Sequence, residues 1–191
     1  MKLLITGFEP FGETNINPSW EAVRRLPDRV GEYELCKLNI PTVYAEAANL
    51  VLEKAQEIGA DAVISVGQAG GRDAVTPERI AVNIRDARIP DNAGILCRGN
   101  RVAEDGPAAY FSTLPVEKIS QAIRDAGIPS AVSNTAGCYV CNDVLYTLLN
   151  VYHDTPVRVG FIHVPWLPEQ GTPNLPLEDT VKALEAAILT L

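Results

Sequence analysis

Apolar runs alternate with amphipathic segments along the chain, and this alternation predicts its secondary structure. Four short apolar runs, which begin near Leu3, Ala62, Ala131 and Val157, have the length and composition of buried β-strands. Residues 33–38 alternate well enough to predict a further strand. Continuous apolar strands of this kind are typical of a parallel sheet that is covered on both faces.

The segments between these strands have the periodicity of helices with one apolar face. Helices are expected over residues 18–26, 43–58, 114–126, 142–149 and 177–191. Asn17 before Pro18 is typical of an N-cap followed by proline at the first helical position, and Gly59 is expected to end the second helix. The alternation predicts an α/β fold: a single three-layer αβα domain over residues 1–191 with a largely parallel, partly mixed central sheet.

Two segments interrupt this regular pattern. Residues 78–84 alternate like a strand with Glu78 at its start, where a glutamate is most often a solvated edge residue. Residues 85–106 are rich in Asp, Asn, Gly and Arg, which predicts a long irregular loop. Loops of this length are often functional.

Composition narrows the class of protein. The chain has 191 residues, of which 47% are hydrophobic and 21% charged, as in globular domains. Its net charge of -8 argues against a nucleic-acid partner. No apolar run is long enough to span a bilayer, and the run after Lys2 is too short for a signal peptide. Four cysteines do not suggest a disulfide framework, so the expected compartment is the reducing cytoplasm.

The segment 133–142, SNTAGCYVCN, offers the first candidate chemistry. It joins a predicted strand at 128–132 to a predicted helix, so Cys141 is expected in the first helical turn. Free N–H groups and the helix dipole there favour an anion, which predicts a lowered thiol pKa and a nucleophilic role. A buried cysteine that packs as a small hydrophobe fits the same pattern, and Cys138 adds a C-x-x-C that fits redox or metal chemistry.

His163 is the candidate base for such a nucleophile. It ends the apolar run before Pro165, where a hydrogen-bonded core histidine is the alternative, whereas His153 lies in a polar loop and is expected to be solvated. A thiol–imidazole pair needs a third group that fixes the ring tautomer. Glu78, at the end of a predicted strand, is a candidate for that group.

Two loops that follow predicted strands are candidate ligand sites, because ligands bind at the carboxyl ends of strands in α/β sheets. Phe8 and Phe11 lie in a Pro/Gly loop, where they either pin the loop to the core or line a pocket for a flat apolar group. The glycine-rich segment 67–71 lacks the spacing of known phosphate-binding loops. It is expected to let backbone groups approach a small ligand.

Short motifs in a fixed order relate the chain to a known family. They are TGFEPFG at 6–12, NPS at 17–19, VGQAGG at 66–71, PERIAVN at 77–83, DARIPDN at 86–92, AGCYVCN at 136–142 and IHVP at 162–165. Together they make the chain resemble the pyroglutamyl peptidase type I family, also called pyrrolidone-carboxylate peptidase. The resemblance covers essentially the whole chain.

The resemblance implies a cysteine peptidase that removes N-terminal pyroglutamyl (5-oxoprolyl) residues from peptides through a thioester. It implies Cys141 as nucleophile, His163 as base and Glu78 as orienting carboxylate, and an oxyanion site made by Arg88 and the backbone N–H of Cys141. For the pyroglutamyl pocket it implies Phe8, Phe11, Thr42, Gln68, Ile89, Tyr139 and Val140. It also implies a homotetramer. The acyl-transfer chemistry of the thiol and the imidazole itself requires no metal or organic cofactor.

Cys138 departs from the family pattern, which commonly has a non-cysteine such as threonine at this position. Three other interpretations remain open. They are a thiol–disulfide oxidoreductase that uses Cys138 and Cys141, a non-enzymatic small-molecule binding module around residues 67–71, and a zinc site. Thiol–disulfide oxidoreductases usually have a tryptophan before the first cysteine, and this chain has none there. A zinc site would need its remaining ligands from scattered residues.

Overall fold

A computed structural model describes residues 1–12 and 14–191, which fold around one six-stranded sheet with the strand order β2-β3-β1-β4-β8-β5. The central strands β1, β3, β4 and β8 are parallel, and the short strands β2 and β5 are antiparallel at the two edges. This arrangement confirms the prediction of a largely parallel, partly mixed sheet. The strands are β1 (Lys2–Phe8), β2 (Arg29–Val30), β3 (Tyr33–Ile40), β4 (Ala62–Gln68), β5 (Thr76–Pro77) and β8 (Arg158–Val164).

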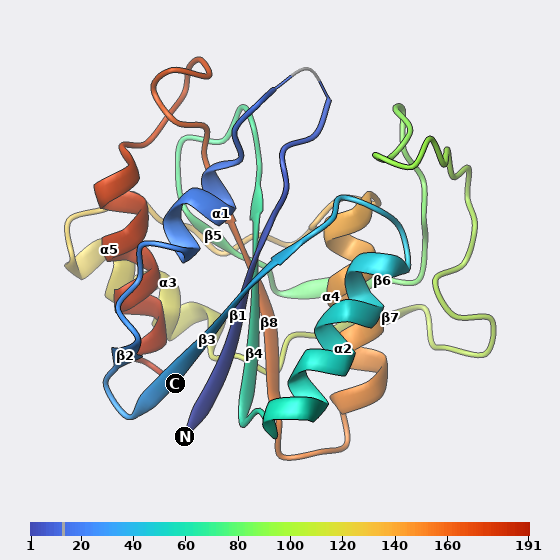
Figure 1. The fold of residues 1–191 in the computed structure, drawn as a ribbon, viewed down its shortest axis with the longest axis horizontal. Helices are drawn as coiled ribbons and strands as arrows, with labels where there is room; N and C mark the ends of the chain where they lie inside the picture. The colour runs from blue at the N-terminus through green and yellow to red at the C-terminus, as the bar shows by residue number, and fades with distance from the viewer. Residues whose placement is uncertain (13) are drawn as a thin grey trace.

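Helices cover both faces of the sheet, which Figure 1 shows nearly edge-on. Helices α1, α3 and α5 share one buried cluster with the face of the sheet that includes Leu3 and Ile5. Helices α2 and α4 share a second cluster with the face that includes Leu4 and Phe8, as the alternation of strand side chains requires. The helices are α1 (Pro18–Val23), α2 (Glu46–Ile58), α3 (Val116–Asp125), α4 (Val140–Tyr152) and α5 (Leu177–Ile188).

A two-stranded antiparallel pair, β6 (Ile80–Val82) and β7 (Ala109–Phe111), lies beside this sheet and brackets a long loop. The loop is irregular, as the sequence predicts, but hydrogen bonds to a buried side chain of the loop itself fix its backbone. The buried carboxylate of Asp91 accepts hydrogen bonds from the backbone N–H groups of Ala93 at 3.0 Å and Ile95 at 2.8 Å. It also accepts one at 2.9 Å from Tyr44, which ties the loop to the segment before α2.

Local signals predict several helix ends correctly. Asn17 is the N-cap of α1, where its Oδ1 accepts a hydrogen bond from the N–H of Ser19 at 3.1 Å, and Gly59 ends α2 in the left-handed conformation at φ 61°. The prediction that α2 begins at residue 43 is wrong. Ala45 takes φ 60° while its N–H bonds Asp143 of α4 at 2.8 Å, so α2 begins at Glu46.

One strand prediction in this region is wrong, and another is only partly right, because β6 covers just Ile80–Val82 of the strand expected over 78–84. The strand expected over 128–132 is reduced to one isolated bridge, from Ser130 to Val75, and a second bridge joins Ser133, just after this segment, to Glu78. Pro129 contributes a carbonyl but has no N–H to continue a ladder. The strand expected over 78–84 is split, because the N–H of Glu78 bonds Phe161 of β8 whereas that of Arg79 bonds Ser133. Glu78 therefore lies where the backbone changes its hydrogen-bond partner from β8 to Ser133.

Within residues 1–12 and 14–191, no helix is both long enough and apolar enough to cross a bilayer.

Candidate active site

A cavity of about 330 Å³ opens at the carboxyl ends of the central strands. The end of β1 contributes Phe8, the end of β4 contributes Gln68, and β8 contributes His163. Cys141 reaches the cavity from the start of α4. This is the edge of an α/β sheet at which ligands bind most often.

Most of the residues that the sequence singles out line this cavity, namely Phe8, Phe11, Thr42, Gln68, Tyr139, Cys141 and His163. Val140 is fully buried beside Cys141 and does not line it. Arg88 and Ile89 are exposed on the long loop and are not among the lining residues either. The roles of Arg88, Ile89 and Val140 stay predictions.

His163 and Glu78 form a buried hydrogen-bonded pair. The ring Nδ1–H of His163 donates to Oε1 of Glu78 at 2.7 Å, and the two residues are only 4% and 0% exposed. A carboxylate can only accept, so the proton lies on Nδ1 and the lone pair of Nε2 is free. The alternative of Glu78 as a solvated edge residue is therefore wrong.

Burial and pairing set the charges of this pair. Burial lowers the pKa of His163 and outweighs the opposing hydrogen bond and charge of Glu78. Burial alone would raise the pKa of Glu78, but the hydrogen bond from His163 and the charge of His163, together with the hydrogen bond from Arg72, lower it. The resting state is therefore a neutral imidazole held by an ionised carboxylate.

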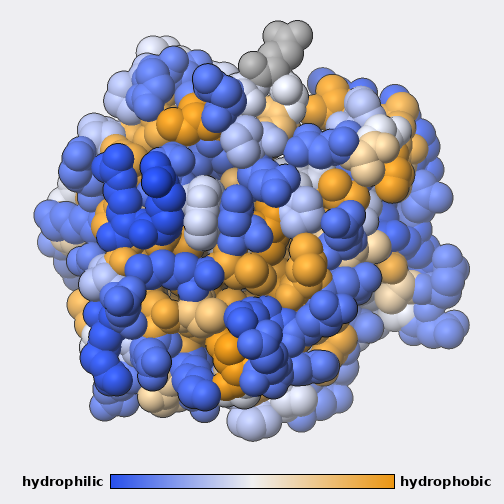
Figure 2. Space-filling model, in the orientation of Figure 1, coloured by the Kyte–Doolittle hydropathy of each residue, from blue (hydrophilic) through white to orange (hydrophobic). Residues whose placement is uncertain are grey.

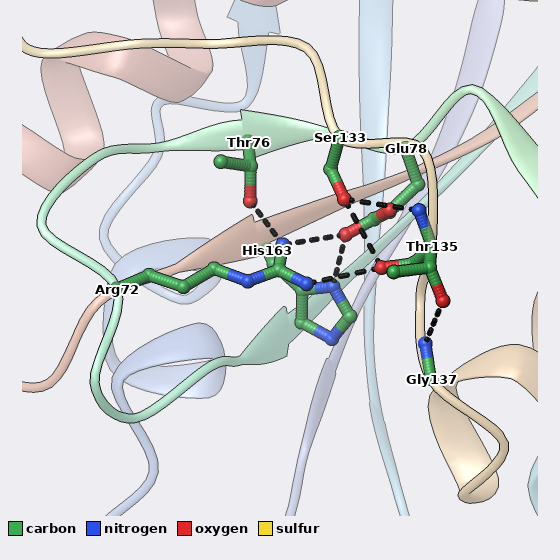
Figure 3. Close-up of polar contacts among 7 residues, drawn as sticks. All are labelled: Arg72, Thr76, Glu78, Ser133, Thr135, Gly137 and His163. Carbon is green, nitrogen blue, oxygen red and sulfur yellow. Dashed lines mark hydrogen bonds and ion pairs between the residues drawn. The ribbon is translucent and has the colours of Figure 1, made fainter.

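Arg72 completes this buried network, and the sequence did not single it out. Its Nη1 donates to the same Oε1 of Glu78 at 2.6 Å and to Oγ1 of Thr76 at 2.5 Å, and its Nη2 donates to the carbonyl of Thr135 at 3.1 Å (Figure 3). Arg72 also lines the cavity. A signal for it existed, because an arginine directly after the glycine-rich loop, a few residues before Glu78, is placed to turn back onto that carboxylate.

The loop before α4 is held by short local hydrogen bonds. The hydroxyl of Ser133 donates to the carbonyl of Thr135 at 3.0 Å, and Oγ1 of Thr135 accepts from the N–H of Gly137 at 3.1 Å (Figure 3). Gly137 has φ 76°, a conformation that favours glycine. These contacts, with Arg72 on the Thr135 carbonyl, fix the entry of the chain into α4.

Gly67 leaves the space in which the thiol of Cys141 lies. A Cβ atom added at Gly67 would lie 3.0 Å from the Sγ of Cys141 and 2.7 Å from the ring of Phe161. Gly67 is also the register partner of His163 across β4 and β8. The thiol therefore lies over the strand pair that carries the histidine, and both groups line the same cavity.

The expected helix position of Cys141 is confirmed, since it is the second residue of α4, but the expected lowering of its pKa is wrong. Burial raises the pKa of Cys141 to about 12, and the charge of Glu78 adds to this. The charge of Arg72 and a backbone hydrogen bond oppose the shift, with smaller effects. The resting thiol is therefore protonated at neutral pH.

Aromatic rings form the apolar wall of the cavity. The ring of Tyr139 lies 6.1 Å, centroid to centroid, from that of Phe11, which also lines the cavity. It lies 5.6 Å from the ring of Tyr44, which does not line the cavity but supports Tyr139. The hydroxyl of Tyr139 donates to the carbonyl of Pro90 at 3.0 Å, which links this wall to the long loop. The wall suits a flat apolar group, as the two phenylalanines of the first loop predict.

The cysteines and the possible metal ligands were singled out by the C-x-x-C of the sequence. All four cysteines are free in the structure, as a reduced C-x-x-C would also be. In the described ranges, no three His, Cys, Asp or Glu side chains lie close enough together to hold a metal ion. The zinc interpretation therefore has no ligand set in this part of the chain.

Comparisons with known proteins give matches along the whole chain. The model of the family described as Pyroglutamyl peptidase matches residues 1–191. The pyrrolidone-carboxylate peptidase of Levilactobacillus brevis is 51% identical over 98% of this chain and 96% of its own length. That of Lactobacillus johnsonii is 49% identical over 98% and 91%. The crystal structure of pyroglutamyl peptidase I from Bacillus amyloliquefaciens has a TM-score of 0.95 and 43% identity, covering 99% of this chain and 93% of that one.

The protonated thiol predicts how Cys141 reacts with iodoacetamide. Only the thiolate is alkylated, so the rate should rise by roughly tenfold per pH unit between about pH 6 and 10, with no plateau. Peptide mass spectrometry can follow Cys141 separately from Cys36, Cys97 and Cys138. A rate that levels off near neutral pH would instead mean a preformed thiolate.

The buried network predicts the effect of Arg72 on the titration of His163. The charge of Arg72 helps to lower the pKa of His163, so Arg72→Gln should raise that pKa, whereas Arg72→Lys should change it less. NMR titration of the ring protons can measure this directly, because the chain has only two histidines. His153, whose ring packs on Tyr110, is the internal reference. An unmoved His163 in Arg72→Gln would contradict the assigned network.

Proposed function

The chain belongs to the pyroglutamyl peptidase family, and from this membership we propose a role for each residue of the cavity. Members of the family remove N-terminal pyroglutamyl residues from peptides, and this enzyme is a cysteine-type hydrolase with that activity. The observation that carries the assignment of roles is the buried hydrogen bond of 2.7 Å between Glu78 and His163, beside the thiol of Cys141. In this proposal Cys141 is the nucleophile, His163 the general base and acid, and Glu78 the carboxylate that orients the ring.

The first half of the reaction transfers the acyl group to sulfur. Nε2 of His163 takes the thiol proton as Sγ of Cys141 bonds the acyl carbon of the pyroglutamyl residue, and the carbonyl electron pair moves onto oxygen. Collapse of this tetrahedral intermediate breaks the C–N bond, and His163 gives its proton to the leaving amine. Glu78 stabilises the imidazolium that exists between these two proton transfers.

The second half releases pyroglutamate. His163 takes a proton from a water molecule as its oxygen attacks the thioester carbon, and the proton then returns to sulfur as the C–S bond breaks. The initial pair of thiol and imidazole is neutral, so the charges form only during the reaction. The carboxylate and the guanidinium behind the ring are already in place when they form.

Two donors are proposed for the oxyanion. The backbone N–H of Cys141 lies in the first turn of α4, where N–H groups have no partner inside the helix. Arg88 is proposed on the sequence motif at 86–92 alone, because its side chain is exposed and outside the cavity lining. Both donors would act on charge that exists only in the tetrahedral intermediate.

The pyroglutamyl ring is a neutral lactam, and the cavity suits such a group. Aromatic faces from Phe8, Phe11 and Tyr139 can enclose the ring, while Thr42 and Gln68 supply polar groups for its N–H and C=O. Among the described residues that line the cavity there is no Asp or Glu, so no lining carboxylate can bind a free amine. We also propose Val140 and Ile89 for this pocket, from the motifs alone.

Assembly and location are proposals of the same kind. We infer that residues 1–191 form one domain and that four copies assemble in the cytoplasm. Exposed apolar side chains on the long loop support an assembly surface, with Ile95 46% and Leu96 46% exposed. Figure 2 shows apolar residues among the hydrophilic ones at the right-hand side, where this loop projects.

The proposed nucleophile is tested with two cysteine variants and a chromogenic pyroglutamyl amide. Cys141→Ser should lower kcat/KM by at least about a thousandfold, because the hydroxyl is a far weaker nucleophile in this setting. Cys138→Ser is the matched control and should keep kcat/KM within about threefold. If Cys138→Ser is as inactive as Cys141→Ser, the thiol–disulfide interpretation gains support and the assignment fails.

The proposed pocket is tested by selectivity against an N-terminal proline. Proline has nearly the shape of pyroglutamate but lacks the ring carbonyl, and its nitrogen is a protonated amine. The apolar cavity would have to desolvate this charge, and the lactam's hydrogen-bond partners would stay unmatched. Prolyl amides should therefore be hydrolysed at least about a thousandfold more slowly in kcat/KM. Turnover of a prolyl amide within about tenfold of the pyroglutamyl amide would refute this account of the pocket.

A further inference from the structure

The side-chain amide of Gln170 joins three segments next to the cavity. Gln170 lies in the loop after β8, and its amide bonds its own loop at Leu167, the first loop at Ile16 and the end of β4 at Gln68. Gln68 lines the cavity, and so does Asn17, the neighbour of Ile16. Gln170 is therefore placed to control a wall of the cavity.

Two backbone groups fix which way the Gln170 amide points. The N–H of Leu167 can only donate, so the atom it meets at 3.0 Å must be Oε1 of Gln170. The carbonyl of Ile16 can only accept, so the atom it meets at 3.3 Å must be Nε2. These two backbone groups thus fix which end of the Gln170 amide is oxygen and which is nitrogen, a choice that is ambiguous for an isolated amide.

The orientation of the Gln170 amide determines the orientation of the Gln68 amide. The second hydrogen of Nε2 of Gln170 points to Gln68 at 2.9 Å, so the Gln68 atom that receives it must be Oε1. A rotated Gln68 amide would place NH₂ against NH₂ and leave a hydrogen bond unmade. Gln68 is therefore held with its own Nε2 as the free end.

We infer that Gln170 is a positioning residue for substrate specificity, because it makes Gln68 present a hydrogen-bond donor to the cavity. Within residues 1–12 and 14–191, Nε2 of Gln68 donates no hydrogen bond, so its hydrogens are free for a ligand. This inference rests on the proposed function, in which Gln68 contacts the pyroglutamyl ring. The ring carbonyl is the acceptor that pyroglutamate has and proline lacks, and a fixed donor matches it.

A double-mutant cycle tests whether Gln170 acts through Gln68. Gln170→Leu removes all of its side-chain hydrogen bonds, and Gln68→Leu removes the donor itself. Each single variant should lower kcat/KM for a pyroglutamyl amide by about tenfold to a hundredfold. If Gln170 acts through Gln68, then Gln170→Leu should have little further effect in a Gln68→Leu background.

Gln170→Glu is a second variant, which keeps the size of the side chain and the bond from Leu167. Its carboxylate puts an acceptor opposite Gln68, so the Gln68 amide should rotate and turn Oε1 to the cavity. The ratio of kcat/KM for pyroglutamyl over prolyl amide should fall by at least about tenfold. Glu169→Gln, at the exposed neighbouring position, is the matched control and should leave this ratio unchanged.

The rate of Cys141 alkylation by iodoacetamide separates this role from general damage. It should be the same in the Gln170 variants and the wild-type enzyme. Additive losses in the cycle, or an unchanged substrate ratio in Gln170→Glu, would overturn the inference. Turnover of the pyroglutamyl amide by the wild-type enzyme tests the proposed function itself, so the two failures are distinguishable.

Discussion

Keeping a carboxylate ionised without access to water is the constraint on which the rest of the site depends. Glu78 is fully buried, so its charge needs donors of its own, and His163 and Arg72 both donate to its Oε1. To bring them together, the chain leaves β4 through the glycine-rich turn and returns along β8 as β5. It then changes partner at Glu78, from β8 to Ser133. The same change of partner places Ser133, in the loop that leads to Cys141, next to Glu78.

Much of this arrangement follows from local patterns that a sequence displays. Apolar runs mark the central strands, Asn17 and Gly59 mark helix ends, and the small residues before Cys141 mark the turn into α4. Such signals act over a few residues, so they predict the ends of strands and helices from which the site residues project. Because the carboxyl ends of parallel strands share one edge, they also predict that Phe8, Gln68 and His163 meet.

Features that depend on distant contacts could not be predicted this way. The orientation of Arg72 toward Glu78 is set by the path of β5, and the pKa of Cys141 is set by burial of its thiol next to Gly67. A helix start alone predicts a lowered thiol pKa, but the loss of solvent outweighs the helix in this cavity. The failed strand at 128–132 has a similar origin, because an apolar run says nothing about which neighbour supplies its hydrogen bonds. Pro129 has no N–H to donate, and Ser130 alone forms a bridge, to Val75, so no continuous strand forms.

The high pKa of Cys141 also has a consequence for the survival of the enzyme under oxidants. Peroxides attack the thiolate form of cysteine, and a thiol with a pKa of about 12 exposes almost none of it at neutral pH. Many cysteine nucleophiles are ionised at rest and so are targets of oxidation even when no substrate is bound. Here the sulfur becomes nucleophilic only while the imidazole removes its proton during attack on an acyl group. The protonated resting state thus limits sulfenic acid formation without a separate protective device.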